Sequence, residues 1–304
     1  MGFLKKFTKQ EISWMMYDWA NSAHSVIVVT ILPIFFDTVA GYTADSVSSM
    51  STWGFATSLA MAIVALSAPF LGVFGDIRGM RKKLFTAFML IGVVSVAGLS
   101  FTPFMDFTAS PDAAGRVAAI VLVLYITSTI GFDASCIYYD AFLTDVTTED
   151  RMDEVSSNGF AWGYLGSCIP FLIALIAYVL GPDMVGLIPA LLSRGIGVFV
   201  TAAWWLMVTV PLLLGYTQKN YSSGESASVG AAFRKIFGTL RHIALHDKKV
   251  LFFLIAFFLY IDGVGTIIDN CINIGTDLNL NTVGQVIFLL ATQVVAFGGS
   301  LVFA

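Results

Sequence analysis

Two aspartates stand inside one strongly apolar stretch of this chain, Leu251–Cys271. Asp262 and Asp269 are seven residues apart, which is about two turns of an α-helix, so both carboxylates would lie on one face. A carboxylate that faces lipid carries a large free-energy cost, so this face should look onto protein or onto a water-filled path. The spacing therefore predicts a polar face at membrane depth that can hold a polar solute or a proton.

A second polar group stands where the first apolar stretch begins, in the segment Tyr17–Ala23 (YDWANSA). Asp18 and Ser22 share a helical face, and Asn21 lies beside them. The segment Tyr260–Thr266 has the same residue types, with a tyrosine, an aspartate, small residues and a hydroxyl. An aspartate near a helix start is also explained by the positive end of the helix dipole, so a structural role for Asp18 stays open.

A further aspartate, Asp133, lies in the apolar stretch Val117–Tyr138 and shares a helical face with Thr129, Cys136 and Asp140. A carboxylate in surroundings of low dielectric constant is a candidate proton acceptor. Pairing with a neighbouring amide or hydroxyl would explain Asp133 equally well, and both interpretations are kept.

The composition is that of a membrane protein. Of the 304 residues, 57% are hydrophobic and 12% are charged, whereas a soluble domain has about 25% charged residues. Crossing about 30 Å of hydrocarbon takes roughly 20 residues of helix. Eight stretches are long and apolar enough, and we expect an all-α membrane protein: Trp14–Phe36, Trp53–Phe74, Leu84–Met105, Val117–Tyr138, Ser156–Leu180, Leu187–Leu214, Val250–Cys271 and Thr282–Ala304.

The basic residues predict the orientation. Of the sixteen lysines and arginines, all except Arg116 and Arg194 fall before the first stretch or in alternate loops, which places them on one side of the membrane. Loops rich in lysine and arginine remain in the cytoplasm. We therefore expect an integral, multi-pass protein of a bacterial cell membrane with a cytoplasmic amino terminus.

The segment 215–249 separates two groups of apolar stretches. It opens with a polar run that we expect to be flexible (TQKNYSSGESAS) and continues with apolar residues at helical spacing between basic ones, which is typical of an amphipathic helix on the membrane surface. The expected units are a six-helix bundle (1–214), a cytoplasmic linker (215–249) and two further helices (250–304). Because Ala304 closes an apolar run, we expect a fragment that lacks four helices, with an eight-helix protein as the alternative.

The turn Gly72–Lys83 joins the second and third stretches. Asp76 can cap the following helix or pair with a basic neighbour, and Gly79 permits a tight turn. The spacing resembles the loop signature of the major facilitator superfamily, in which this loop takes part in conformational gating. The positions that match are Gly72, Asp76, Gly79 and Arg81, and the positions that depart from it are Ile77 and Met80.

Four segments together carry a closer resemblance: Tyr17–Ala23, Tyr138–Leu143 (YYDAFL), Gly163–Gly166 (GYLG) and Tyr260–Gly263 (YIDG). This combination resembles the vacuole-effluxer family of the major facilitators, whose fungal members are autophagy-related and export amino acids from vacuoles. The chain departs from the family pattern at Asp140, where asparagine is usual, and at His24, where an aromatic residue is common. The resemblance implies a major-facilitator-type helical bundle of twelve helices in two six-helix halves, with the solute near the centre. This chain would then hold the first half and the first two helices of the second.

We therefore expect a secondary active transporter that moves a small polar solute by alternating access, with an amino acid as the leading candidate and with protons as the candidate coupling ion. The aspartates at positions 18, 133 and 262 should face the central cavity. Asp262 is the first choice for the coupling proton because it lies about 18 Å along its helix, near the midplane. The full predicted site is Asp18, Asn21, Ser22, Asp133, Tyr260, Asp262, Thr266 and Asp269.

Two alternatives remain from the sequence. A membrane-embedded enzyme acting on lipids would need the acidic loop Asp145–Glu154 to hold a metal, and a receptor on a transporter fold would bind solute without moving it. We expect neither an enzyme nor a resident cofactor or metal. The expected partners are a small-molecule solute, protons and membrane lipids, and not nucleic acid.

Overall fold

The computed structural model describes residues 6–44, 48–181, 185–187, 189–221, 229–269, 271, 274–275, 278–280 and 282–303. Within these ranges all the regular secondary structure is helical. The long helices are α1 (Lys9–Ala40), α2 (Ser49–Gly75), α3 (Met80–Leu99), α4 (Pro111–Val146), α5 (Met152–Leu180), α6 (Ala190–Gly215), α7 (Val229–His246), α8 (Lys248–Asp269) and α10 (Thr282–Phe303). Two short 3₁₀ helices, η2 (Thr102–Phe104) and η3 (Glu149–Arg151), lie beside α4 in the sequence.

Seven helices of the described chain are long and apolar enough to cross a membrane, and they contain the first seven predicted stretches or most of them. The helices extend beyond the predicted stretches at most ends, because helical hydrogen bonding continues past the apolar residues. The eighth predicted stretch corresponds to α10, a helix of 22 residues. The expected all-α membrane protein is therefore confirmed.

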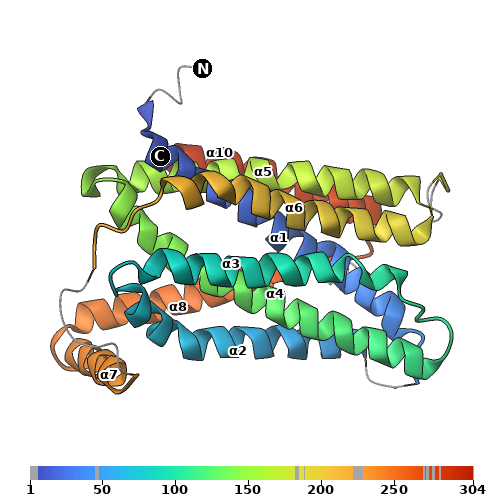
Figure 1. The fold of residues 1–304 in the computed structure, drawn as a ribbon, viewed down its shortest axis with the longest axis horizontal. Coiled ribbons are helices and arrows are strands. Elements are labelled where there is room, and N and C mark those ends of the chain that lie inside the picture. The colour runs from blue at the N-terminus through green and yellow to red at the C-terminus, as the bar shows by residue number, and fades with distance from the viewer. Residues whose placement is uncertain are drawn as a thin grey trace.

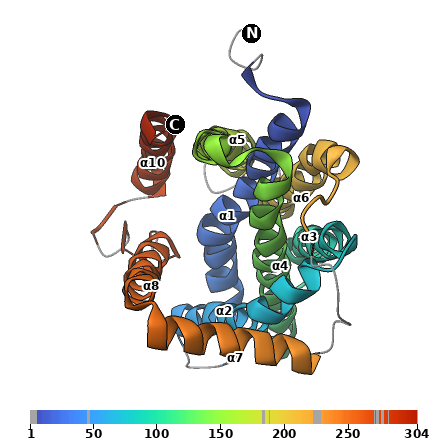
Figure 2. The ribbon, with the colours of Figure 1, turned by 90° about the vertical axis from the view of Figure 1, so that its left-hand side faces the viewer.

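The long helices run side by side, and α7 differs from them in direction (Figure 1). Figure 2 views the molecule from one end and shows α7 lying across that end, with α8 and α10 together on one side of the group α1–α6. We name this the basic end, because the turn between α2 and α3, with its arginines and lysines, lies there.

Local sequence explains where the helices begin. Thr8 caps α1: its hydroxyl accepts from the Glu11 N–H, and the Glu11 carboxylate accepts from the Thr8 N–H. Ser110 caps α4 in front of Pro111, a residue suited to the first helical position. Gly79 precedes α3 with φ +74°, a left-handed conformation that glycine adopts without strain.

The core lies among α1, α3, α4, α5 and α6, with α1 packed against α4, α5 and α6. Large aromatic side chains fill it, and the bulkiest are less than 2% exposed: Trp205, Tyr17, Tyr138, Phe85 and Phe142. By contrast, only 11% of the residues in the most apolar part of α2 are buried, and none of those in the most apolar part of α8. Exposed apolar surface of this extent suits hydrocarbon rather than water.

The polar run after α6 does not behave as predicted. Residues Thr217–Tyr221, expected to be flexible, are held against the basic end by hydrogen bonds that Gln218 and Asn220 make. The rest of the run, residues 222–228, lies outside the described residues. The helix predicted beyond it is present as α7.

Candidate functional site

Asp18 is buried where α1 meets α4 and α5. The residue is 7% exposed, and within the described part of the chain its Oδ2 atom has no hydrogen-bond partner. Helix α5 comes close enough that a Cβ atom added to Gly159 would lie 2.8 Å from this oxygen. A side chain at position 159 would therefore displace the carboxylate.

An aromatic group surrounds this carboxylate. The Tyr139 ring on α4 stacks on Trp14 with 4.5 Å between the centroids and lies 4.7 Å from the Tyr17 ring. The buried Tyr139 hydroxyl lies within electrostatic reach of Asp18, although no hydrogen bond joins the hydroxyl to the carboxylate. The charged group that acts on Asp18 is a second carboxylate, Asp140, and no cation of the described residues offsets the charge of Asp18.

Three aspartates converge on one thiol. Cys136 on α4 lies within electrostatic reach of Asp18, Asp133 and Asp140, and it accepts a long hydrogen bond of 3.6 Å from Asn21 Nδ2. We name Asp18, Asp133 and Asp140 the acidic cluster. It joins α1 to α4 at a point where Asp140 is exposed and Asp133 is half-buried.

Helix α5 closes the same site through small residues. A Cβ added to Gly163 would lie 3.0 Å from the Ser22 hydroxyl, and one added to Gly166 would lie 1.0 Å from Trp19 Cδ1. Glycine is thus required for α1 and α5 to approach this closely. Four of the predicted site residues, Asp18, Asn21, Ser22 and Asp133, are therefore brought together around α1, α4 and α5.

The predicted residues of α8 lie apart from this group. Tyr260, Asp262 and Thr266 are exposed, and the side chain of Asp269 lies outside the described residues. The Tyr260 hydroxyl is within electrostatic reach of Tyr164 on α5. Since two residues along a helix turn the side chain by about 200°, Asp262 points to a different side from Tyr260. A role for Asp262 in a central site stays a prediction.

His24 packs in the interior of the bundle. It is 2% exposed, its ring stacks on Phe132 at 4.7 Å between centroids, and its Nε2 lies 3.4 Å from the Ser128 hydroxyl. These contacts hold α1 against α4, which is a packing role.

The sequence did not single out Tyr139, Trp14 or Trp19 as site residues, although each lies against Asp18 or Gly166. Trp14 and Asp18 are four residues apart on α1 and share a helical face, so this spacing could have identified Trp14 as a neighbour of Asp18. The contact with Tyr139 depends on how α4 is placed.

The predicted gating loop forms an ion-pair network at the basic end. Arg81 is 5% exposed, and its Nη2 lies 3.1 Å from Asp76 Oδ1 while its Nη1 lies 2.9 Å from Asp145 Oδ2. The same guanidinium donates to the carbonyls of Ala141 (3.2 Å) and Gly75 (3.4 Å). Arg81 therefore fastens the turn after α2 to the last turns of α4, and Asp76 pairs with a basic neighbour rather than capping α3.

Asp145 also holds the chain beyond α6. Its carboxylate accepts from the Tyr216 hydroxyl and from the backbone N–H groups of Lys219 (3.1 Å) and Asn220 (2.7 Å). Burial and this carboxylate raise the pKa of the Tyr216 hydroxyl above its ordinary value, so the hydroxyl stays a donor.

This network corrects one prediction. The acidic loop Asp145–Glu154, considered as a possible metal site, is divided in the structure: Asp145 is fully buried in α4 and paired with Arg81, while Glu149, Asp150 and Asp153 are exposed. Carboxylates at opposite extremes of burial do not converge on one metal ion.

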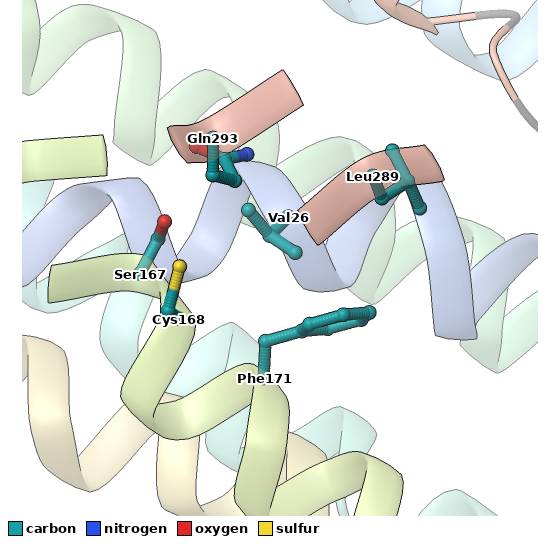
Figure 3. A pocket seen from close by; sticks show the side chains of 6 residues that line it. All are labelled: Val26, Ser167, Cys168, Phe171, Leu289 and Gln293. Carbon is teal, nitrogen blue, oxygen red and sulfur yellow. The ribbon is translucent and has the colours of Figure 1, made fainter. Parts of the chain in front are cut away.

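A narrow crevice marks where α10 meets the bundle. Figure 3 shows Ser167, Cys168 and Phe171 of α5 facing Leu289 and Gln293 of α10, with Val26 of α1 behind them. The space is too small for a solute. Gln293 Oε1 is buried there without a hydrogen-bond partner among the described residues, so a polar group sits in the contact between α5 and α10.

Comparison with known proteins decides the family. The model of the family described as "Vacuole effluxer Atg22 like" matches residues 41–152 and 144–304. An MFS-type transporter of Bacillus subtilis (strain 168), YxiO, is 36% identical over 302 residues, which cover 99% of this chain and 68% of that protein. The chain belongs to the Atg22-like vacuole effluxer family.

Membership of the Atg22-like family makes the chain a multi-pass membrane transporter of the major facilitator type, and not an enzyme. The resemblance noted in the sequence is thereby confirmed. No solved structure matches the chain.

Proposed function

We propose that this Atg22-like chain moves a small polar solute, with an amino acid as the leading candidate, by alternating access coupled to protons. The observation that carries the proposal is Asp18 in the acidic cluster at the contact of α1 with α4, next to the glycines of α5. Its Oδ2 atom is buried without a hydrogen-bond partner among the described residues, and such a group is costly unless a ligand or a proton completes it.

Asp18 is the best-placed proton carrier among the described residues. Its Oδ2 is buried without a hydrogen-bond partner, and the charged residue that acts on it is Asp140, which has the same sign of charge. An ionised carboxylate in this position is offset by a proton or by a cationic group of the solute. The ammonium group of an amino acid has the required charge.

Asp262, the first choice from the sequence, becomes the second candidate. It lies on α8, which would occupy the place equivalent to α1 if the two halves are repeats. Its side chain is exposed on α8. Exchange of a proton between Asp18 on one half and Asp262 on the other would couple the halves.

The division into a six-helix unit (1–214), a linker (215–249) and the start of a second unit (250–304) belongs to the same proposal. In the described residues α1–α6 pack with one another and α8 packs on α7, while α10 packs on α5 across the boundary between the two units. We also propose that the basic end is cytoplasmic, because loops rich in lysine and arginine remain in the cytoplasm.

Counterflow in proteoliposomes tests the proposal. Vesicles loaded with an unlabelled amino acid should accumulate the same labelled amino acid when the full chain is present, and should not when it is omitted. Binding of amino acids without accumulation would favour a receptor. Absence of both binding and flux for the twenty amino acids would overturn the assignment of the solute.

A further inference from the structure

Helix α7 lies across the basic end of the bundle and runs in a different direction from the spanning helices (Figures 1 and 2). It packs on α2 and on α8. Because the spanning helices run along the membrane normal, a helix that crosses their ends lies in the plane of the membrane surface.

The apolar side of α7 is only partly covered by protein. Ile236 and Ile243 are half-buried, whereas Phe237 is 63% exposed and Leu240 is 54% exposed. Helix α2, on which α7 packs, is itself largely exposed and apolar, so its surface suits acyl chains. Phe237 and Leu240 thus stand at the level where hydrocarbon gives way to headgroups.

Positive charge borders this apolar side. Arg234 and Arg241 are both exposed and are seven residues apart, which places them on one side of the helix. Lys248 and Lys249 follow at once and are exposed too. The acidic residue of this stretch, Asp247, lies 3.8 Å from His242, so it faces another side chain rather than the arginines.

We propose that α7 is a docking surface for the headgroups of anionic phospholipids in the adjoining leaflet. The phosphates would lie against Arg234, Arg241 and the two lysines, while Phe237 and Leu240 enter the acyl boundary. An acidic protein would match the charges but would leave the exposed apolar side in water, and a neutral lipid would match the apolar side alone. Anionic lipid satisfies both.

A fluorescent probe on α7 tests the proposal. The full chain, with Cys136, Cys168 and Cys271 replaced by serine, carries the substitution Leu240→Cys labelled with an environment-sensitive dye. It is reconstituted into phosphatidylcholine vesicles with increasing fractions of phosphatidylglycerol. We expect the emission to shift to the blue as the anionic lipid increases, and high salt should reverse part of the shift.

Two charge variants give the control. Replacing Arg234, Arg241, Lys248 and Lys249 by glutamine should weaken the attraction about fivefold for each charge removed, so far more phosphatidylglycerol is needed for the same shift. The matched variant Arg234→Lys with Arg241→Lys keeps the charge and should respond as the parent does. An emission that is independent of phosphatidylglycerol, or a glutamine variant that responds like the parent, would overturn the proposal, whatever solute the protein moves.

Discussion

Arg81 and Asp145 form a buried ion pair, with 2.9 Å between Nη1 and Oδ2 and with side chains that are 6% and 0% exposed. Asp145 also accepts from Tyr216 and from the backbone of Lys219 and Asn220. One carboxylate therefore ties together the turn after α2, the end of α4 and the chain that leaves α6.

Loss of this carboxylate should be costly. Replacing Asp145 by asparagine leaves Arg81 buried without its closest counter-charge, which lowers the free energy of unfolding by about 3 kcal/mol. Asp76 pairs with the same arginine but its side chain is 45% exposed, so Asp76→Asn should cost less than about 1 kcal/mol. Thermal unfolding in detergent measures both variants, and equal losses would show that burial does not govern the network.

The close contact of α5 with α1 predicts that two glycine-to-alanine substitutions differ in their effect on stability. A Cβ at position 166 would lie 1.0 Å from Trp19 Cδ1, so Gly166→Ala forces the helices apart and should destabilise the protein by about 3 kcal/mol or prevent its accumulation. Gly54 in α2 has no atom within 4 Å of the same position, so Gly54→Ala should be neutral or slightly stabilising. Unfolding temperatures that fall equally for the two would contradict the packing described.

The sequence predicted the helices well because each needs only length and apolar composition, as in Leu84–Met105 or Val117–Tyr138. It also predicted that Asp18 and Ser22 share a face with Asn21 beside them, since that follows from helical periodicity. It did not predict that Tyr139 and Gly159 would lie against Asp18, because contacts between α1, α4 and α5 depend on how the helices are rotated and placed. Spacing within one helix carries no information about its neighbours.

The network at the basic end shows the same limit. The turn at Gly79 and the charge of Arg81 were visible in the sequence, whereas the burial of Asp145 was not, since acidic residues near a loop are usually solvated. The run Thr217–Tyr221 looked flexible from composition. Its order comes from partners distant in sequence, such as Gly75 and Thr144.

Gln218 should protect this run from proteolysis. Its side chain accepts from the Gly79 N–H at 2.8 Å and donates to the Gly75 carbonyl at 3.1 Å. Removing both contacts in Gln218→Ala should free the chain around Lys219, so trypsin cleaves there several times faster. Gln10 makes only a 3.5 Å contact with the same lysine, and Gln10→Ala should leave the cleavage rate unchanged. Equal rates in parent and Gln218→Ala would contradict the account.

Glu11 anchors the amino-terminal end of α1 to the start of α5. Its carboxylate is 2% exposed and accepts from Thr147 (2.7 Å) and from Arg151 (2.8 Å). Because hydrogen bonds to a charged group are the stronger ones, Glu11→Gln should lower the free energy of unfolding by about 2 kcal/mol. The exposed Glu149 is the matched control, and Glu149→Gln should change stability by less than about 0.5 kcal/mol. Thermal unfolding distinguishes the two, and no difference between them would rule out the anchoring role.

We propose that Asp18 carries the coupling proton of a solute transporter. The most direct measurement is solute flux driven by a pH gradient across proteoliposomes, for the parent and for Asp18→Asn, Asp262→Asn and Asp106→Asn, the last being an exposed loop residue. We predict that Asp18→Asn still exchanges solute but no longer responds to the gradient, and that Asp262→Asn loses the response as well if the two aspartates act together, while Asp106→Asn behaves as the parent. Gradient-driven flux that persists unchanged in Asp18→Asn would contradict the account.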